Sequence, residues 1–151
     1  MEDIFDLLNT SKVENVKLYV SCITECPITG DKGLKYVCNE IDYYIKKYEN
    51  LTELCLSDTC GTLGFYNFKS IIDYIVMYYD DTVLDKISLH SHKNKDKKET
   101  YNIINYAYNN GIKRFDVSCL ENTGGCSVTM NNSSMKENLH YDDINSMLFN
   151  K

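Results

Sequence analysis

Short apolar stretches alternate with longer amphipathic stretches along most of this chain of 151 residues. Apolar runs rich in β-branched residues and leucine predict four strands, over 17–22, 53–57, 86–90 and 114–119. Apolar residues at helical spacing predict four helices, over 34–50, 67–79, 98–111 and 141–149. Gly111, at the end of the third helix, is a residue typical of a C-terminal cap.

The order of these elements predicts the fold class. Near-continuous apolar strands separated by helices are typical of parallel pairing with right-handed crossovers. The strand ends recur about every 30 to 35 residues, as βα units do. A (β/α)₈ barrel needs eight strands and about 250 residues, so four units leave two architectures open. We predict one α/β domain over 1–151 with parallel strands, either an open sheet or half of a barrel.

Composition and charge narrow the classes of function. Hydrophobic residues make up 43% and charged residues 25%, as in an ordinary globular domain. The net charge of −6 argues against a nucleic-acid partner. No apolar run reaches the roughly 20 residues of a membrane span, and the acidic start resembles no leader, so we expect no membrane partner. Seven cysteines, an odd number spread singly, indicate reduced thiols and a cytoplasmic protein.

Polar and reactive residues follow each predicted strand, in the sequences SCITECPITG, SDTCG, HSH and SCLENTGGCS. In parallel α/β folds the carboxyl ends of the strands carry the chemistry. His90 and His92, two of only three histidines, would project from the same face of a strand end. Two imidazoles held in this way can bind a metal ion, although exposed or hydrogen-bonded histidines would give the same pattern.

Five motifs together resemble a known family. The series YVSCITECP, LSDTCG, LHSH, GGCS and ENL is similar, in the same order, to the C-terminal half of 3-hydroxy-3-methylglutaryl-CoA lyase. That family belongs to a superfamily of TIM-barrel metallolyases that includes isopropylmalate and homocitrate synthases. The resemblance runs from about residue 17 to 148, and Gly124-Gly125-Cys126 is its most discriminating element. It implies a partial TIM barrel of four consecutive βα units.

The resemblance also implies a metal site. His90 and His92 match two ligands of a divalent cation, Mg²⁺ or Mn²⁺. Asn138 best matches a further ligand, while Asn131 and Asn132 stay open as alternatives. Substrate oxygens would take the remaining positions around the ion.

A reaction and its catalytic residues follow from the same resemblance. Cys126, His92 and Asp58 match the positions implied in catalysis. The implied substrate is an acyl-CoA, 3-hydroxy-3-methylglutaryl-CoA, which is cleaved to acetyl-CoA and acetoacetate. His92 or a nearby group would take the hydroxyl proton, and Cys126 would act near the second proton transfer.

The chain departs from the family pattern in three places. These 151 residues contain no counterpart of the family's first-strand Asp-Arg-Glu signature, which supplies a metal ligand and a catalytic arginine. Lys93 stands where the family has Asp or Asn, and a cation there would weaken metal binding by repulsion. Ser127 stands where the family has proline.

These departures leave three hypotheses. The chain is half of an active lyase completed by a complementary half-barrel chain, or an inactive truncated homologue that binds acyl-CoA or a partner protein. The third hypothesis is a homo-oligomer in which two copies form one barrel. All three predict association unless helices cover the sheet edges, because an open half-barrel leaves two unpaired strand edges.

Several of these residues also have simpler interpretations. Cys126 can be an ordinary loop thiol, and Asp58 can be a helix N-cap. His140 is expected on the surface. The remaining cysteines are expected as small core residues or as packing residues in loops, namely Cys22, Cys38, Cys55 and Cys119 in the core and Cys26 and Cys60 in loops.

Overall fold

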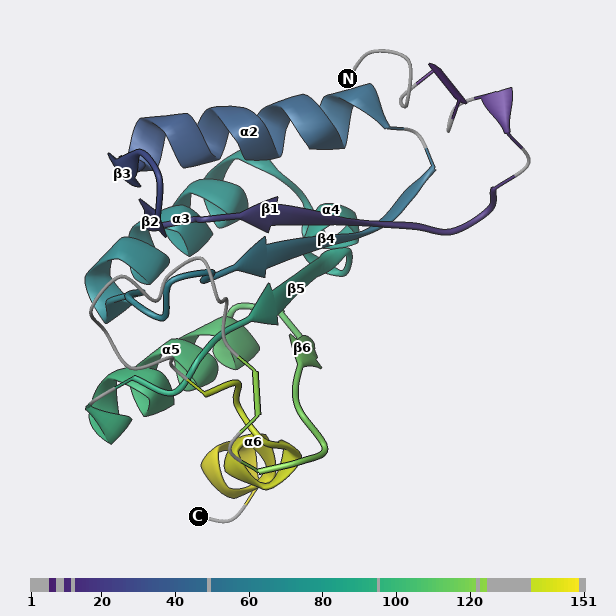
Figure 1. The fold of residues 1–151 in the computed structure, drawn as a ribbon. Helices are drawn as coiled ribbons and strands as arrows, with labels where there is room; N and C mark the ends of the chain where they lie inside the picture. Colours follow the sequence, from purple (N-terminus) through teal and green to yellow (C-terminus); the bar gives the residue numbers. More distant parts are fainter. Residues whose placement is uncertain are drawn as a thin grey trace.

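The computed structural model describes residues 6–7, 10–11, 13–48, 50–94, 96–121, 123–124 and 137–149. Its centre is a sheet of four parallel strands in the order β1-β4-β5-β6 (Figure 1). The strands are β1 (Val16–Ser21), β4 (Leu51–Ser57), β5 (Ile87–His90) and β6 (Arg114–Asp116). The main helices are α2 (Leu34–Lys47), α3 (Phe65–Tyr78), α5 (Lys97–Asn109) and α6 (Tyr141–Leu148).

The sheet has one apolar face and one polar face. Helices α2, α3 and α5 cover the apolar face (Figure 1), where buried residues of the strands and helices form one core. Its largest fully buried side chains include Leu54, Leu56, Ile87, Leu89, Phe68 and Ile41. The alternate strand positions carry polar side chains to the other face, as the two-residue period of a strand requires. In a closed barrel, that polar face would be the interior.

The predicted fold class is confirmed: the strands are parallel, alternate with helices, and form an unclosed part of a barrel. All four strands and all four helices of the prediction are present, with ends shifted by a few residues. Gly111 caps α5 with a φ of 98°, a conformation that favours glycine. The amide of Ile112 then donates to the carbonyl of Ala107 at 3.0 Å, as in a Schellman motif.

Three local features differ from the prediction. Strand β6 ends at Asp116 rather than at residue 119, because Ser118 pairs instead with His140 in the C-terminal segment. An antiparallel pair, β2 (Glu25–Cys26) and β3 (Gly30–Asp31), follows β1. A one-turn helix, α4 (Asp81–Leu84), begins after Asp80, whose carboxylate accepts from the amides of the next turn.

The cysteine expectations hold in part. Cys38 and Cys55 are buried, as predicted. Cys119 is exposed, so its placement in the core was wrong, because the strand that would have buried it has already ended. None of the helices in the described ranges is long and apolar enough to cross a membrane.

Candidate functional site

An open cavity of about 330 Å³ lies at the carboxyl ends of the parallel strands. Ser21 and Ser57, the last residues of β1 and β4, line one side of it, and His90 and His92 line another. Asn138 completes the wall from the C-terminal segment. The fold therefore brings together the three residues that the sequence predicted as metal ligands.

The two imidazoles are held close together and nearly perpendicular. Their ring centroids are 5.1 Å apart with an interplanar angle of 84°. Nδ1 of His92 lies 2.6 Å from the carbonyl oxygen of Asp58 and must donate to it, since a carbonyl only accepts. The Nε2 atom of His92 is then the nitrogen with a free lone pair. A backbone acceptor that fixes the tautomer in this way is the usual support of a metal-binding histidine.

His90 is kept in its neutral form. Burial, and then the neighbouring His92, lower the pKa of His90, while Asp116 acts weakly in the opposite direction. A histidine must be unprotonated to bind a metal, so this environment suits a ligand.

Asn138 reaches the cavity because the C-terminal segment, residues 137–140, lies alongside the residues that follow β5. The amide of Lys93 donates to the carbonyl of Glu137 at 2.8 Å, and Asn138 pairs with His92 in an antiparallel bridge. Oδ1 of Asn138 is buried and has no hydrogen-bond partner within the described residues. Gly124 packs so tightly on this amide that a Cβ there would overlap it. The site thus holds a buried acceptor next to two imidazoles, which fits a cation.

Asp58 acts on the backbone of its own turn. Its Oδ1 accepts from the amides of Thr62 at 3.0 Å and Leu63 at 3.2 Å, and the residue is 3% exposed. Burial raises the pKa of Asp58 despite these hydrogen bonds. It is not the N-cap of α3, which is Gly64, so that interpretation was wrong. Its side chain does not line the cavity, and its carbonyl oxygen orients His92.

Lys93 does not face the cavity as an unpaired cation. Its Nζ lies 3.1 Å from Asp143 and 3.5 Å from Glu137, so two carboxylates neutralise it. Burial acts to lower the pKa of Lys93, but these two carboxylates outweigh it and raise the pKa. The two carboxylates therefore offset the repulsion that the sequence predicted between Lys93 and a bound metal ion.

The structure tests the expectation for His140 but does not describe the other candidate residues of the loop. His140 is not a surface histidine: its side chain is 15% exposed and caps α6, accepting from the amide of Asp142 at 3.2 Å. Cys126, Asn131 and Asn132 lie outside the described residues. Across the described part of the chain, no group of three or more His, Cys, Asp or Glu side chains is arranged to hold a metal. Among the described residues that line the cavity, the candidate ligands are therefore two imidazoles and one amide.

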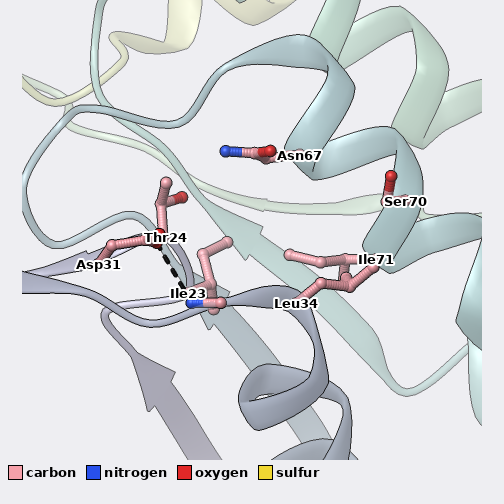
Figure 2. A pocket seen from close by; sticks show the side chains of 8 residues that line it. Ile23, Thr24, Asp31, Leu34, Asn67, Ser70 and Ile71 are labelled. Atoms are coloured by element: carbon pink, nitrogen blue, oxygen red, sulfur yellow. Dashed lines mark hydrogen bonds between the residues drawn. The ribbon is translucent and has the colours of Figure 1, made fainter.

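Further hollows adjoin these elements. One of about 460 Å³ shares His90 and Asn138 with the candidate site and adds Tyr19 and Asp116. A smaller one, of about 180 Å³, lies between the β2–β3 hairpin, α2 and α3 (Figure 2). Its charged residue, Asp31, accepts from the amide of Gly33 at 3.2 Å, so this hollow carries no group poised for catalysis. No sequence motif pointed to it.

Fold and site together define a class: a part of a parallel (β/α) barrel with a candidate metal site at the carboxyl edge of the sheet. Solved 3-hydroxy-3-methylglutaryl-CoA lyases share this fold. The Brucella melitensis enzyme aligns with a TM-score of 0.76 at 19% identity, over 98% of this chain and 48% of that one. The Acinetobacter baumannii enzyme, solved with coenzyme A and 3-methylmalate, aligns at 0.73 and 21% over 96% and 43%. The Pseudomonas aeruginosa enzyme aligns at 0.72 and 22% over 97% and 45%.

These similarities establish the fold of the chain and the share of each lyase that it covers. The chain spans less than half the length of the lyases it matches. No family model matches the sequence, and no curated protein matches it.

Proposed function

We propose that this chain is the metal-binding half of a carbon–carbon lyase of the 3-hydroxy-3-methylglutaryl-CoA lyase type. Completed by a second half-barrel, it would cleave that acyl-CoA to acetyl-CoA and acetoacetate in the cytoplasm. The observation that carries the proposal is the buried Oδ1 of Asn138 beside His90 and His92, which has no hydrogen-bond partner among the described residues. A buried acceptor costs free energy unless a donor or cation meets it.

The ligand roles follow from the donor atoms. Oδ1 of Asn138 and one ring nitrogen each of His90 and His92 would hold Mg²⁺ or Mn²⁺. Such an ion, when bound, would polarise the hydroxyl and carboxylate oxygens of the substrate. The donor set is poor in oxygen for these hard cations, so the isolated chain would bind them weakly. A carboxylate from the complementary half would complete the site.

His92 has one nitrogen available for two roles. Its Nδ1 is committed to the carbonyl of Asp58, so Nε2 can hold an ion or accept a proton, but not both at once. We assign it to the ion, and the base that takes the hydroxyl proton would come from the complementary half. Ser57 and Thr59 line the cavity, and their hydroxyls would orient the substrate. Cys126 would deliver the proton to the departing acetyl-CoA carbon.

One observation favours a second candidate function. The described ranges contain no group of three or more His, Cys, Asp or Glu side chains arranged to hold a metal, which fits an inactive homologue that binds acyl-CoA or a partner protein. In that case the cavity would bind a ligand without turnover.

The first experiment measures Mn²⁺ binding by electron paramagnetic resonance, together with acetoacetate release from 3-hydroxy-3-methylglutaryl-CoA. We expect the wild-type chain to bind Mn²⁺ and the His92→Ala and Asn138→Ala variants to bind it at least about tenfold more weakly, as is usual when a metal site is disturbed. Acetoacetate release is expected only when a complementary half-barrel is added.

The matched control is His140→Asn, which removes a histidine outside the cavity and supplies a good N-cap in its place. It should bind Mn²⁺ as the wild type does. Equal binding by the wild type and His92→Ala would contradict the metal site. Metal binding without turnover in any reconstituted assembly would support the binding module instead.

A further inference from the structure

Three thiols gather near the carboxyl end of β1. Cys22 follows β1 directly, Cys26 is the last residue of β2, and Cys60 lies in the turn after β4. Cys22 and Cys26 line one cavity of about 270 Å³, and each thiol shifts the pKa of the other. Cys60 is directed elsewhere, since its Sγ donates to the carbonyl of Glu25 at 3.2 Å.

The two sulfurs of the pair have opposite environments. Hydrogen bonds from the Thr29 side chain and from the backbone amides of Ile28 and Thr29 lower the pKa of Cys26 to about 7. Burial raises the pKa of Cys22, which therefore stays a neutral thiol at pH 7. Burial also raises the pKa of Cys60, to about 11. One thiolate and one adjacent thiol are what a nucleophilic cysteine and its resolving partner require.

We propose that Cys26 and Cys22 are an oxidisable dithiol pair, in which Cys26 reacts with a hydroperoxide and Cys22 resolves the product to a disulfide. The Cys26 thiolate attacks one peroxide oxygen, the O–O bond breaks, and the other oxygen leaves as hydroxide or alkoxide and takes up a proton. Cys26 is then a sulfenic acid. Cys22 gives up its proton and attacks the Cys26 sulfur, so that the S–S bond forms, the S–O bond breaks, and water leaves.

The pair is coupled to the candidate site through the backbone. Cys22 has a φ of 61°, and its amide donates to the Thr59 hydroxyl at 3.0 Å. Thr59 and Ser21, the residue before Cys22, both line the cavity that holds the histidines. A disulfide at Cys22 would therefore act on the part of the chain that supports that cavity. The chemistry of the pair itself does not depend on the proposed lyase function.

The test treats the reduced full chain with one equivalent of hydrogen peroxide, blocks the remaining thiols, and analyses tryptic peptides by mass spectrometry. Both cysteines fall in the single peptide 18–32, so an internal disulfide appears as a loss of about 2 Da in that peptide. We expect this loss in the wild type and in the control Cys119→Ser, which removes an exposed thiol. Cys22→Ser should stop at a sulfenic acid on Cys26, which dimedone traps.

Alkylation of the unoxidised chain gives a second measurement. Cys26 should react with iodoacetamide at least about tenfold faster than Cys22 at pH 7, with a midpoint near its pKa of about 7. The proposal is overturned if peptide 18–32 keeps both thiols while other cysteines oxidise, or if Cys26→Ser leaves Cys22 equally reactive to peroxide. Circular dichroism of each variant separates these results from misfolding.

Discussion

At the scale of single residues, Asp58 shows how a carboxylate in a motif can serve structure. Its side chain satisfies two amides of the turn after β4, and its carbonyl oxygen fixes the ring of His92. A motif match cannot distinguish these structural roles of Asp58 from a catalytic role, because each requires the same residue at the same position. The geometry favours a positioning role, since the carboxylate does not line the cavity.

Two substitutions of Asp58 test that role. Asp58→Ala leaves the amides of Thr62 and Leu63 without their acceptor, and we expect it to lower the free energy of unfolding by about 1–3 kcal/mol. Asp58→Asn keeps an amide oxygen at the same place and should cost much less. Urea unfolding at pH 7 measures both. If Asp58→Asn weakens Mn²⁺ binding as much as His92→Ala does, the carboxylate acts on the site directly.

At the scale of elements, the C-terminal segment decides whether the site exists. Glu137, Asn138 and Leu139 lie along the residues that follow β5, where the Leu139 amide donates to the carbonyl of Ser91 at 3.4 Å. This addition brings Asn138, 46 positions after His92 in the printed sequence, to its side. The ion pairs of Lys93 with Glu137 and Asp143 hold the same segment from its outer side.

Substitution of Lys93 distinguishes two effects that its charge can have on the site: holding the C-terminal segment in place or repelling the metal ion. If its ion pairs hold the segment, Lys93→Met should weaken Mn²⁺ binding and speed hydrogen exchange at the Leu139 amide. The loss of stability should be small, about 0.5–1 kcal/mol, because the pairs are partly exposed. If charge repulsion dominates instead, Lys93→Met should bind Mn²⁺ more tightly, with exchange unchanged. Nuclear magnetic resonance of the labelled chain measures both quantities.

A charge reversal provides the control. Lys93→Glu places a third carboxylate beside Glu137 and Asp143 and should loosen the segment further. Combining it with Glu137→Lys restores an opposite pair and should recover part of the protection at Leu139. Failure of the double variant to recover any protection would argue against the ion pairs as the cause.

The sequence predicted those elements whose signal is local. Apolar periodicity located the strands and helices, and the two-residue spacing of His90 and His92 placed both rings at one strand end. It could not predict the end of β6, because Ser118 leaves the sheet to pair with His140, a contact between distant segments. The pairing of Lys93 and the capping role of His140 depend on the same long-range packing. Asn138 was found only through resemblance to a family.

At the scale of the whole molecule, the polar face of the sheet determines how a barrel can be completed. Lys17 lies 2.7 Å from Glu53 and 2.6 Å from Asp116, and Ser88 donates to Glu53 at 2.6 Å. With Arg114 near Glu53, two cations and two carboxylates form one layer that is neutral at pH 7. A partner that covers this face meets charges that are already paired, which lowers the cost of desolvating it.

The neutrality of this layer gives a prediction for assembly. Burial acts to raise the pKa values of Glu53 and Asp116, but Lys17 outweighs it and holds both below their usual range. A depressed carboxyl pKa stabilises the paired state above the ordinary carboxyl range, and that contribution is lost as the pH falls through the depressed values. Protonation of both carboxyls leaves Lys17 and Arg114 uncompensated on the face that a partner covers. We therefore expect the chain to associate at pH 7, by sedimentation velocity, and to dissociate as the pH falls below about 4.

Glu53→Gln combined with Asp116→Asn imitates the protonated layer at neutral pH. The layer then carries two uncompensated cations in every copy, and covering it would bury like charges, so self-association should weaken at least about tenfold. Asp73→Asn removes a carboxylate that pairs with Lys69 on helix α3 and serves as the matched control, with association unchanged. Equal association of all three proteins would place the interface away from this face. A wild type that stays monomeric at every concentration would mean that the face remains open, which would favour the binding-module alternative.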